Sequence, residues 1–284
     1  MRNNDDLQII RKHLEGEFER QLLDAAIYNL LDENNQLRFS NYAYALRELF
    51  LHVIKRMAPD NNVQSCEWFP GLNERDQVAR RDSYKYIIQG GLSDEYVNDE
   101  LGVNISGVFP GLRDAFYSLN KFTHISEKIF PINDVDGLSM VGEVEECIGA
   151  LFNKLDECHK EIISKLDEAV SEAAIHSSIT ETITSIDELS SHSSVDEVYV
   201  DNVRIVEIND SDIVFSVSGS VDVGLQWGSN SDVRNDMGAV GSESFPFTCE
   251  VRSPVYDPER LECDEGAFHA DTSSWWKGYY DEEV

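Results

Sequence analysis

Apolar residues recur at helical spacing through the first 175 residues of the chain. The pattern predicts five main helices, over residues 5–33, 41–57, 76–89, 111–124 and 140–174. Ser93, followed by two acidic residues that favour a helix dipole, predicts a further short helix. Several helices joined by short connections favour an α-helical bundle.

Capping and breaking residues give the expected helix ends in this part. Ser40 can cap the helix over 41–57 with its hydroxyl, and Pro59 is expected to end that helix. The following segment, 60–75, is expected to be a loop, and Gly90 with its glycine neighbour stops the third helix.

The hydrophobic period changes from helical spacing to simple alternation after residue 196, as in half-buried strands. Asn209 and Asp210 suit a turn between two such runs. Gly219 and Gly224 suggest a turn and a bulge, and a polar, glycine-rich stretch over 228–244 is expected to be a loop before another strand. We therefore predict an α+β protein, in which an N-terminal α-helical bundle precedes a small antiparallel β-domain.

Composition shifts along the chain suggest five regions. They are an N-terminal helix or arm (1–36), a helical bundle (37–175), a serine-rich linker (176–195), an acidic β-domain (196–262) and an aromatic, acidic tail (263–284).

The charge of the chain is strongly uneven. The net charge is −31, and residues 176–284 contain 23 acidic and five basic residues, a net charge of −18. Such a surface repels nucleic acid and anionic membranes. Nucleic acid is therefore expected to bind through the helical domain, and a basic partner through the acidic half. The simplest alternative is that the acidity only keeps the protein in solution.

Targeting and redox signals point to the cytoplasm. The charged start contains no apolar signal segment, and no stretch is apolar enough to span a membrane, so no membrane association is expected. The cysteines are odd in number and contain no C-x-x-C pair, which favours reduced thiols. The loop acids Asp232, Asp236 and Glu243 fit no known metal loop. We predict a solvated turn, with neither metal nor cofactor.

The first candidate for catalysis is the segment that contains Arg47, Glu48 and His52. An R-x4-H spacing resembles that of helical HEPN ribonucleases, in which a cation stabilises phosphoryl charge and histidine acts as acid or base. Five helical residues separate two side chains by about 140°, so Arg47 and His52 need not converge. The alternative is a helix face with an ion-paired arginine and an ordinary histidine.

The second candidate is the segment with Asn120, Lys121 and His124 at a helix end. It resembles a degraded HEPN motif that lacks the usual arginine. The alternative is a histidine that is stabilised as a cation by the helix dipole. If the two histidine segments meet in the bundle, Glu48 can orient one imidazole of a joint site.

A basic island interleaved with aromatic residues forms the candidate nucleic-acid site. Guanidinium groups suit phosphates, and aromatic rings stack on bases. Its cations are Arg75, Arg80, Arg81 and Lys85. The alternative is that these cations pair with the protein's own carboxylates.

The end of the chain is the candidate partner-binding segment, because tryptophan and tyrosine are frequent interface anchors. Its aromatic residues are Trp275, Trp276, Tyr279 and Tyr280. The alternative is that this tail packs on its own β-domain.

Two stretches together resemble a known family. Residues 38–60 (RFSNYAYALRELFLHVIKRMAPD) and 86–97 (YIIQGGLSDEYV) resemble the helical part of bacterial predicted pPIWI-associating nucleases. Residues 219–247 resemble the β-module of the same proteins. The resemblance implies a cytoplasmic component of bacterial anti-phage defence with a nuclease role.

The residues and the resemblance together suggest a defence nuclease that cleaves RNA with histidines and without a metal. It would act as a homo-oligomer or with a partner defence protein. In this hypothesis His52 and His124 are the acid and base, and Arg47 and Lys121 stabilise charge. The alternative is a non-catalytic acidic interaction subunit that binds and regulates a basic partner protein.

Overall fold

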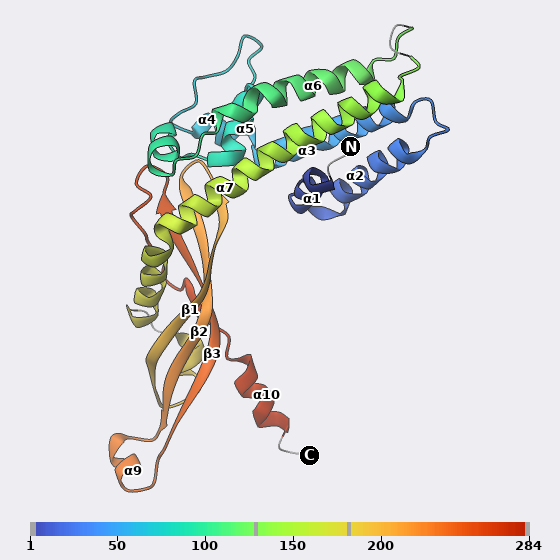
Figure 1. Ribbon diagram of the computed structural model, residues 1–284. Coiled ribbons are helices and arrows are strands. Elements are labelled where there is room, and N and C mark those ends of the chain that lie inside the picture. Colours follow the sequence, from blue (N-terminus) through green and yellow to red (C-terminus); the bar gives the residue numbers. More distant parts are fainter. Residues whose placement is uncertain (1–3, 128–129, 181–182, 282–284) are drawn as a thin grey trace. The chain divides into compact units, whose positions relative to one another are not determined.

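The computed structural model describes residues 4–127, 130–180 and 183–281, with side chains omitted at 4 and 278–281. The chain divides into two compact units, residues 1–161 and 162–284, here called the helical unit and the sheet unit. Figure 1 shows helices in the first unit and long strands in the second. The α+β class predicted from the sequence is confirmed. In the described ranges, no helix has the length and apolar character needed to cross a membrane.

The helical unit is built of short and medium helices followed by one long helix. Its elements are α1 (Asn4–Lys12), α2 (Gly16–Leu31), α3 (Arg38–Met57), α4 (Asp60–Ser65), α5 (Arg80–Gln89), a π-helix η1 (Tyr96–Glu100), a 3-10 helix η2 (Ser106–Val108), α6 (Phe109–Thr123) and the first part of α7 (Asp134–Thr180).

Helix α3 is the centre of the helical unit, in contact with α2, α5 and α6. Ten of its twenty residues are buried. Among these, the hydroxyl of Tyr42 donates a hydrogen bond to Oε1 of buried Glu145 on α7, at 2.7 Å. A polar pair of this kind is tolerated inside a core because each group has a hydrogen-bond partner.

The single helix predicted over 5–33 is wrong, since the chain contains two helices there. The segment between them, 13–15, is not helical, and Gly16 has a φ of +66°. Glycine adopts this left-handed backbone readily, whereas a continuous right-handed helix excludes it. Leu14 in the break is only 3% exposed, so a buried side chain holds the turn in place.

Other helix boundaries also differ from the sequence prediction. Ser40 is not a cap, because α3 begins at Arg38 and Ser40 is buried inside it. The expected loop after Pro59 contains α4, and the long helix begins and ends about a turn and a half outside the predicted bounds of 140–174. Propensity marks the interior of a helix better than its ends.

The sheet unit contains a four-stranded antiparallel meander. Its strands are β1 (His192–Ile208), β2 (Asp212–Trp227), β3 (Ala239–Pro254) and β4 (Phe268–Ala270), in the spatial order β1-β2-β3-β4. Short helix α8 (Thr184–Asp187) precedes β1, α9 (Asn230–Arg234) lies between β2 and β3, and α10 (Ser273–Asp281) follows β4.

The turn predicted at Asn209 is present between β1 and β2. The Asn209 side-chain oxygen accepts hydrogen bonds from the backbone N–H groups of Ser211 and Asp212. The turn predicted near Gly219 is absent, because β2 runs through it without interruption. A bulge lies opposite, between Val200 and Asn202 of β1.

Two segments expected to be irregular contain regular structure. The predicted linker over 176–195 holds the end of α7, all of α8 and the first residues of β1. The predicted loop over 228–244 holds α9 and the start of β3. Side-chain alternation alone does not mark where this strand begins, because every residue of β3 from Ala239 to Ser244 is exposed.

Candidate nucleic-acid site

A cavity of about 600 Å³ lies on the helical unit between α5 and α6. We call it the arginine–aromatic pocket. It is lined by three arginines (Arg80, Arg81, Arg113), four aromatic residues (Tyr84, Phe109, Phe116, Tyr117), and Ser106, Pro110 and Asn120. Its volume lies within the range of about 300–1,000 Å³ that is typical of ligand sites.

Two arginines of α5 lie against aromatic rings of α6. The guanidinium carbon of Arg80 is 3.8 Å from the centroid of the Phe116 ring, and that of Arg81 is 5.4 Å from the Phe109 centroid. Cation–π attraction at such distances restrains the guanidinium groups. Both arginines lie in the first turn of α5, where the helix dipole also favours an anion.

Three of the α6 residues that line the pocket lie on one face of the helix. Arg113, Tyr117 and Asn120 line the pocket at spacings of four and three residues, which places them on one helix face. His124, the C-cap of α6, continues the same spacing one turn beyond Asn120. His124 is exposed, and it is not among the residues that line the pocket.

Tyr84 lines the pocket although it is only 3% exposed. Within the described residues its hydroxyl has no hydrogen-bond partner. Burial raises the pKa of Tyr84 to about 12, with the nearby Arg80 charge acting in the opposite direction. The hydroxyl therefore keeps its proton, and it lies covered below the pocket surface.

The pocket is basic in a protein that is acidic as a whole. None of its lining side chains is acidic. In the part of the chain that the structure describes, Arg80 and Arg81 form no ion pair, whereas exposed Arg113 pairs with its neighbour Asp114 at 3.0 Å. An exposed pair of this kind is weak and is easily exchanged for another anion.

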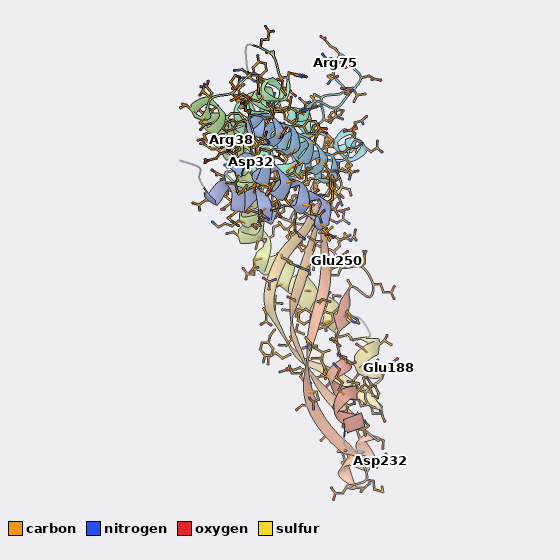
Figure 2. All side chains as sticks on the ribbon, turned by 90° about the vertical axis from the view of Figure 1, so that its right-hand side faces the viewer. Asp32, Arg38, Arg75, Glu188, Asp232 and Glu250 are labelled. Carbon is orange, nitrogen blue, oxygen red and sulfur yellow. The ribbon has the colours of Figure 1, made fainter. Side chains whose placement is uncertain are left out.

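A second cavity, of about 540 Å³, lies beside the first and shares Arg80 with it. It is formed by the loop before α5 and is lined partly by Arg75, whose exposed side chain is labelled in Figure 2. Asn73 shapes this loop, because its side-chain oxygen accepts hydrogen bonds from the backbone N–H groups of Arg75 and Gln77. Arg75, Arg80 and Arg81 thus lie along neighbouring cavities.

Lys85, the fourth cation of the predicted island, is engaged within the protein. Its amine lies 2.6 Å from an Asp94 carboxylate oxygen and 4.1 Å from the centroid of the Trp68 ring. Only 13% of its side chain is exposed, and it does not line either cavity.

His52 lies in a different environment, between α3 and α2. Its Nε2 is 3.4 Å from Oε1 of buried Glu19, and its ring packs edge-on against Phe18. Arg56 holds the same carboxylate through two hydrogen bonds, at 2.8 and 3.1 Å. Arg47 pairs with its neighbour Glu48 at 3.1 Å.

The structure does not bring His52 and His124 together. The rings of Phe50 on α3 and Phe116 on α6 lie 6.2 Å apart, which sets the level at which the two helices cross. From there α6 leads back toward the start of α3, where Arg38 pairs with Asp134 (Figure 1). Measured from this contact, His52 lies two residues further along α3, and His124 lies eight residues further along α6 in the opposite direction. The two histidines are therefore separated by about 15 Å along the helices.

The remaining predicted site residues lie on α6 and α10. Lys121 is exposed next to Asn120, 5.5 Å from the centroid of the Phe122 ring. In α10, Trp275 stacks on Trp227 with centroids 6.0 Å apart, and Trp276 is 42% exposed. The side chains of Tyr279 and Tyr280 lie outside the described residues.

One of the loop acids of the sheet unit, Asp232, caps a short helix. The Asp232 carboxylate accepts hydrogen bonds from the backbone N–H and hydroxyl of Ser229, and so completes a capping box for α9 (Figure 2). In the described ranges there is no group of three or more His, Cys, Asp or Glu residues that is placed to hold a metal ion.

Sequence reasoning found Arg80, Arg81, Asn120 and, among the aromatic residues interleaved with the basic island, Tyr84, but it missed Arg113 and the exposed Tyr117. The available signal was the helical spacing from Arg113 through Tyr117 and Asn120 to His124, which places a cation, a ring, an amide and an imidazole on one face. Nothing in the sequence indicates that this face of α6 lies against α5.

The protein is thus an α+β chain whose helical unit has a pocket lined by arginine and aromatic side chains. Side chains of these types contact anionic and aromatic ligands. Two family models, each described as "Predicted pPIWI-associating nuclease", match residues 11–151 and 155–276. The chain belongs to this family of predicted nucleases. No curated protein and no solved structure matches it.

Proposed function

We propose that this protein is a cytoplasmic nuclease component of bacterial anti-phage defence that acts on RNA. The observation that carries the proposal is the pocket-lining face of α6 from Arg113 to Asn120, which shares the pocket with Arg80 and Arg81 of α5 and has His124 one turn beyond it. Membership of a predicted nuclease family supports the nuclease role. As the sequence suggested, it works as a homo-oligomer or with a partner defence protein.

The proposed chemistry is acid–base cleavage without a metal. In RNA cleavage of this type a base takes the proton of the 2′-hydroxyl as the 2′-oxygen bonds to phosphorus, and the bond to the 5′-oxygen breaks as that oxygen receives a proton from an acid or from water. Cations stabilise the charge on the phosphoryl oxygens. His124 is proposed as the acid–base group, and Asn120 as the residue that orients the substrate. Arg80, Arg81 and Arg113 hold phosphate, and Lys121 supplies a further cation near the same helix end.

His52, Arg47 and Glu48 receive no substrate contact in this proposal. His52 shares the buried Glu19 carboxylate with Arg56, about 15 Å along the helices from His124. A histidine engaged in this way supports the contact between α2 and α3. The catalytic role predicted for His52 from its spacing is tested by the same experiment as that of His124.

The test is cleavage of labelled RNA, single-stranded DNA and duplex DNA by the pure protein, with Mg²⁺ or with EDTA. We expect RNA to be cut in EDTA, and the activity to be lost in His124→Ala but kept in His52→Ala. Equal activity of His124→Ala and the wild type contradicts the proposed role of His124. Loss of activity in His52→Ala but not in His124→Ala would assign the acid–base role to His52, between α2 and α3.

A second candidate function is that of an acidic interaction subunit that binds and regulates a basic partner protein. The observation that favours it is the −18 charge of residues 176–284 together with exposed Trp276 on α10. Opposite charge accelerates association and an aromatic side chain anchors it.

Removal of residues 273–284 tests this second function, because it deletes α10 and leaves β4 in the sheet. Salt-sensitive binding to a basic defence protein is expected to be lost with the segment. Binding that survives the deletion and is insensitive to salt rules out both the tail and the acidic surface.

A further inference from the structure

We propose that the arginine–aromatic pocket binds one unpaired nucleotide of a single strand, with the base stacked against Tyr117 and Arg80 and its phosphate held by Arg81 and Arg113. The protein therefore selects single-stranded over duplex nucleic acid. This inference rests on the proposed function in naming the substrate class of the same site.

The base-stacking surface comes from groups that are already flat and partly exposed. The Tyr117 ring is 73% exposed on the pocket-lining face of α6. The Arg80 guanidinium covers the Phe116 ring at 3.8 Å, so its other face is presented outward. Bases stack on tyrosine rings and on guanidinium planes alike, which gives affinity with little sequence preference.

The phosphate-binding groups lie around this surface. Arg81 and Arg113 come from two different helices, and their guanidinium forks suit phosphate oxygens. Tyr84 lines the same pocket, but its hydroxyl oxygen is covered, so the phosphate contacts assigned to this site are those of the two arginines.

The neighbouring cavity extends the site along a strand. It shares Arg80 with the pocket and adds Arg75, with acidic Glu74 also in its lining, so the cations available to a second phosphate there are Arg75 and the shared Arg80. The two cavities, of about 600 and 540 Å³, together accommodate more than an isolated nucleotide.

A duplex meets this site poorly for two reasons. Its bases are paired and stacked on one another, so no base face is free for Tyr117 or for Arg80. The only contact left to a duplex is that of its phosphate backbone with the few cations of the pocket. The net charge of −31 repels single strands and duplexes alike, so the preference for a single strand follows from the pocket and not from the overall charge.

The test measures binding without cleavage. The probes are a labelled 2′-O-methyl RNA strand, whose blocked 2′-oxygen prevents acid–base cleavage, a DNA strand of the same sequence, and the corresponding duplexes, all in EDTA. Fluorescence anisotropy gives each Kd. We expect both single strands to bind at least tenfold more tightly than their duplexes.

Two pairs of variants separate the pocket from general charge and folding. Tyr117→Ala is compared with Tyr28→Ala, since Tyr28 on α2 is 77% exposed and outside the pocket. Arg113→Gln is compared with Lys160→Gln, because both cations are at least 77% exposed and pair with the next residue. We expect Tyr117→Ala to raise the Kd roughly 5- to 100-fold, Arg113→Gln to raise it severalfold, and both controls to leave it unchanged.

Equal affinity for single strands and duplexes, or equal effects within each pair of variants, overturns the inference. The outcome is distinguishable from failure of the nuclease proposal. Pocket-dependent binding without cleavage of ordinary RNA keeps the inference and contradicts the nuclease role. Cleavage of RNA together with binding that Tyr117→Ala and Arg113→Gln leave unchanged supports the nuclease role and contradicts the inference.

Discussion

The Arg80 guanidinium carbon lies 3.8 Å from the centroid of the Phe116 ring, so a charge carried by α5 rests on an aromatic face of α6. Phe116 is only 3% exposed and lies 6.2 Å, ring to ring, from Phe50 of α3. The buried ring restrains the cation, because a closely packed core permits few side-chain positions. This relationship ties the position of a candidate phosphate-binding group to the core of the helical unit.

The first prediction concerns the shape of that cation rather than its charge. Arg80→Lys keeps the charge but removes the planar group that stacks on Phe116 and forks to phosphate. We expect a fewfold weaker affinity for a single strand in the anisotropy assay. The control is Lys85→Arg, a change of cation outside the pocket that should leave the affinity unaltered. Equal affinity of Arg80→Lys and the wild type contradicts the stacking role.

The second prediction concerns Gly219 in β2. A Cβ atom there would lie 1.9 Å from the backbone oxygen of Tyr199, opposite the β1 bulge, and backbone cannot give way as a side chain does. We expect Gly219→Ala to lower the free energy of unfolding by about 2–3 kcal/mol, measured by urea denaturation.

The matched change is Gly241→Ala in β3, where the nearest atom would be a Trp227 ring carbon at 3.5 Å, an ordinary contact. This variant should unfold at the wild-type urea concentration. Similar destabilisation by both substitutions would show that the loss reflects glycine replacement in a strand generally, and not the close approach to Tyr199.

The third prediction is a loss of stability in mild acid that depends on His159. Burial lowers the pKa of His159 to about 4, against the opposing charge of Asp156 and with further lowering by His13 and Lys12. Between about pH 6.5 and pH 4 the unfolded chain therefore binds a proton that the folded chain does not. Stability falls as the pH falls through this window, by up to about 1.4 kcal/mol per pH unit for one proton.

Urea denaturation followed by helical circular dichroism at several pH values measures that slope. In His159→Leu the slope should be shallower, because the titrating group is gone. Replacement of exposed His124 should leave the slope as it is. A His159→Leu slope equal to that of the wild type would assign the acid loss to other groups.

The fourth prediction concerns Glu19, which is 2% exposed. Burial acts to raise its pKa, but hydrogen bonds from Arg56 and the Glu15 N–H, with the charges of Arg56 and His52, lower the pKa overall. The carboxylate is thus ionised at neutral pH, and its stabilising effect is present above about pH 4.5 and lost below it as the folded state takes up the proton.

Glu19→Gln should therefore destabilise the protein by about 1–3 kcal/mol at pH 7, because Arg56 loses its ionic partner. Glu17→Gln on the exposed face of α2 is the matched control and should change the thermal midpoint little. A thermal midpoint that is the same for both variants refutes a structural role for the Glu19–Arg56 pair.

Much of the fold was predictable because hydrophobic period reports which face of an element is buried. The α3 stripe with Leu46, Leu49 and Val53 is buried as its spacing predicts, and the alternation around Val217 and Val221 marks β2. The break before Gly16 was missed because the apolar period continues across it, while a positive φ has no periodic signal. The strand start at Ala239 was missed because its side chains are exposed.

The candidate site was only partly predictable. Arg80, Arg81 and Asn120 drew attention by residue type, and all three line the pocket. A joint site of His52 and His124 had an equally plausible spacing argument, but the crossing of α3 and α6 at Phe50 and Phe116 separates the two. Spacing along a helix predicts neighbours on that helix and contains no information on which helix lies opposite.

The sequence by itself determined the order of helices before strands, the acidic surface and the residue types available to a site, because period and composition depend on local chemistry alone. The tertiary structure decided that the first turn of α5 meets the Arg113–Asn120 face of α6, and that Lys85 and His52 are engaged elsewhere. Such contacts join residues far apart in the chain, and only the packing of the core brings them together.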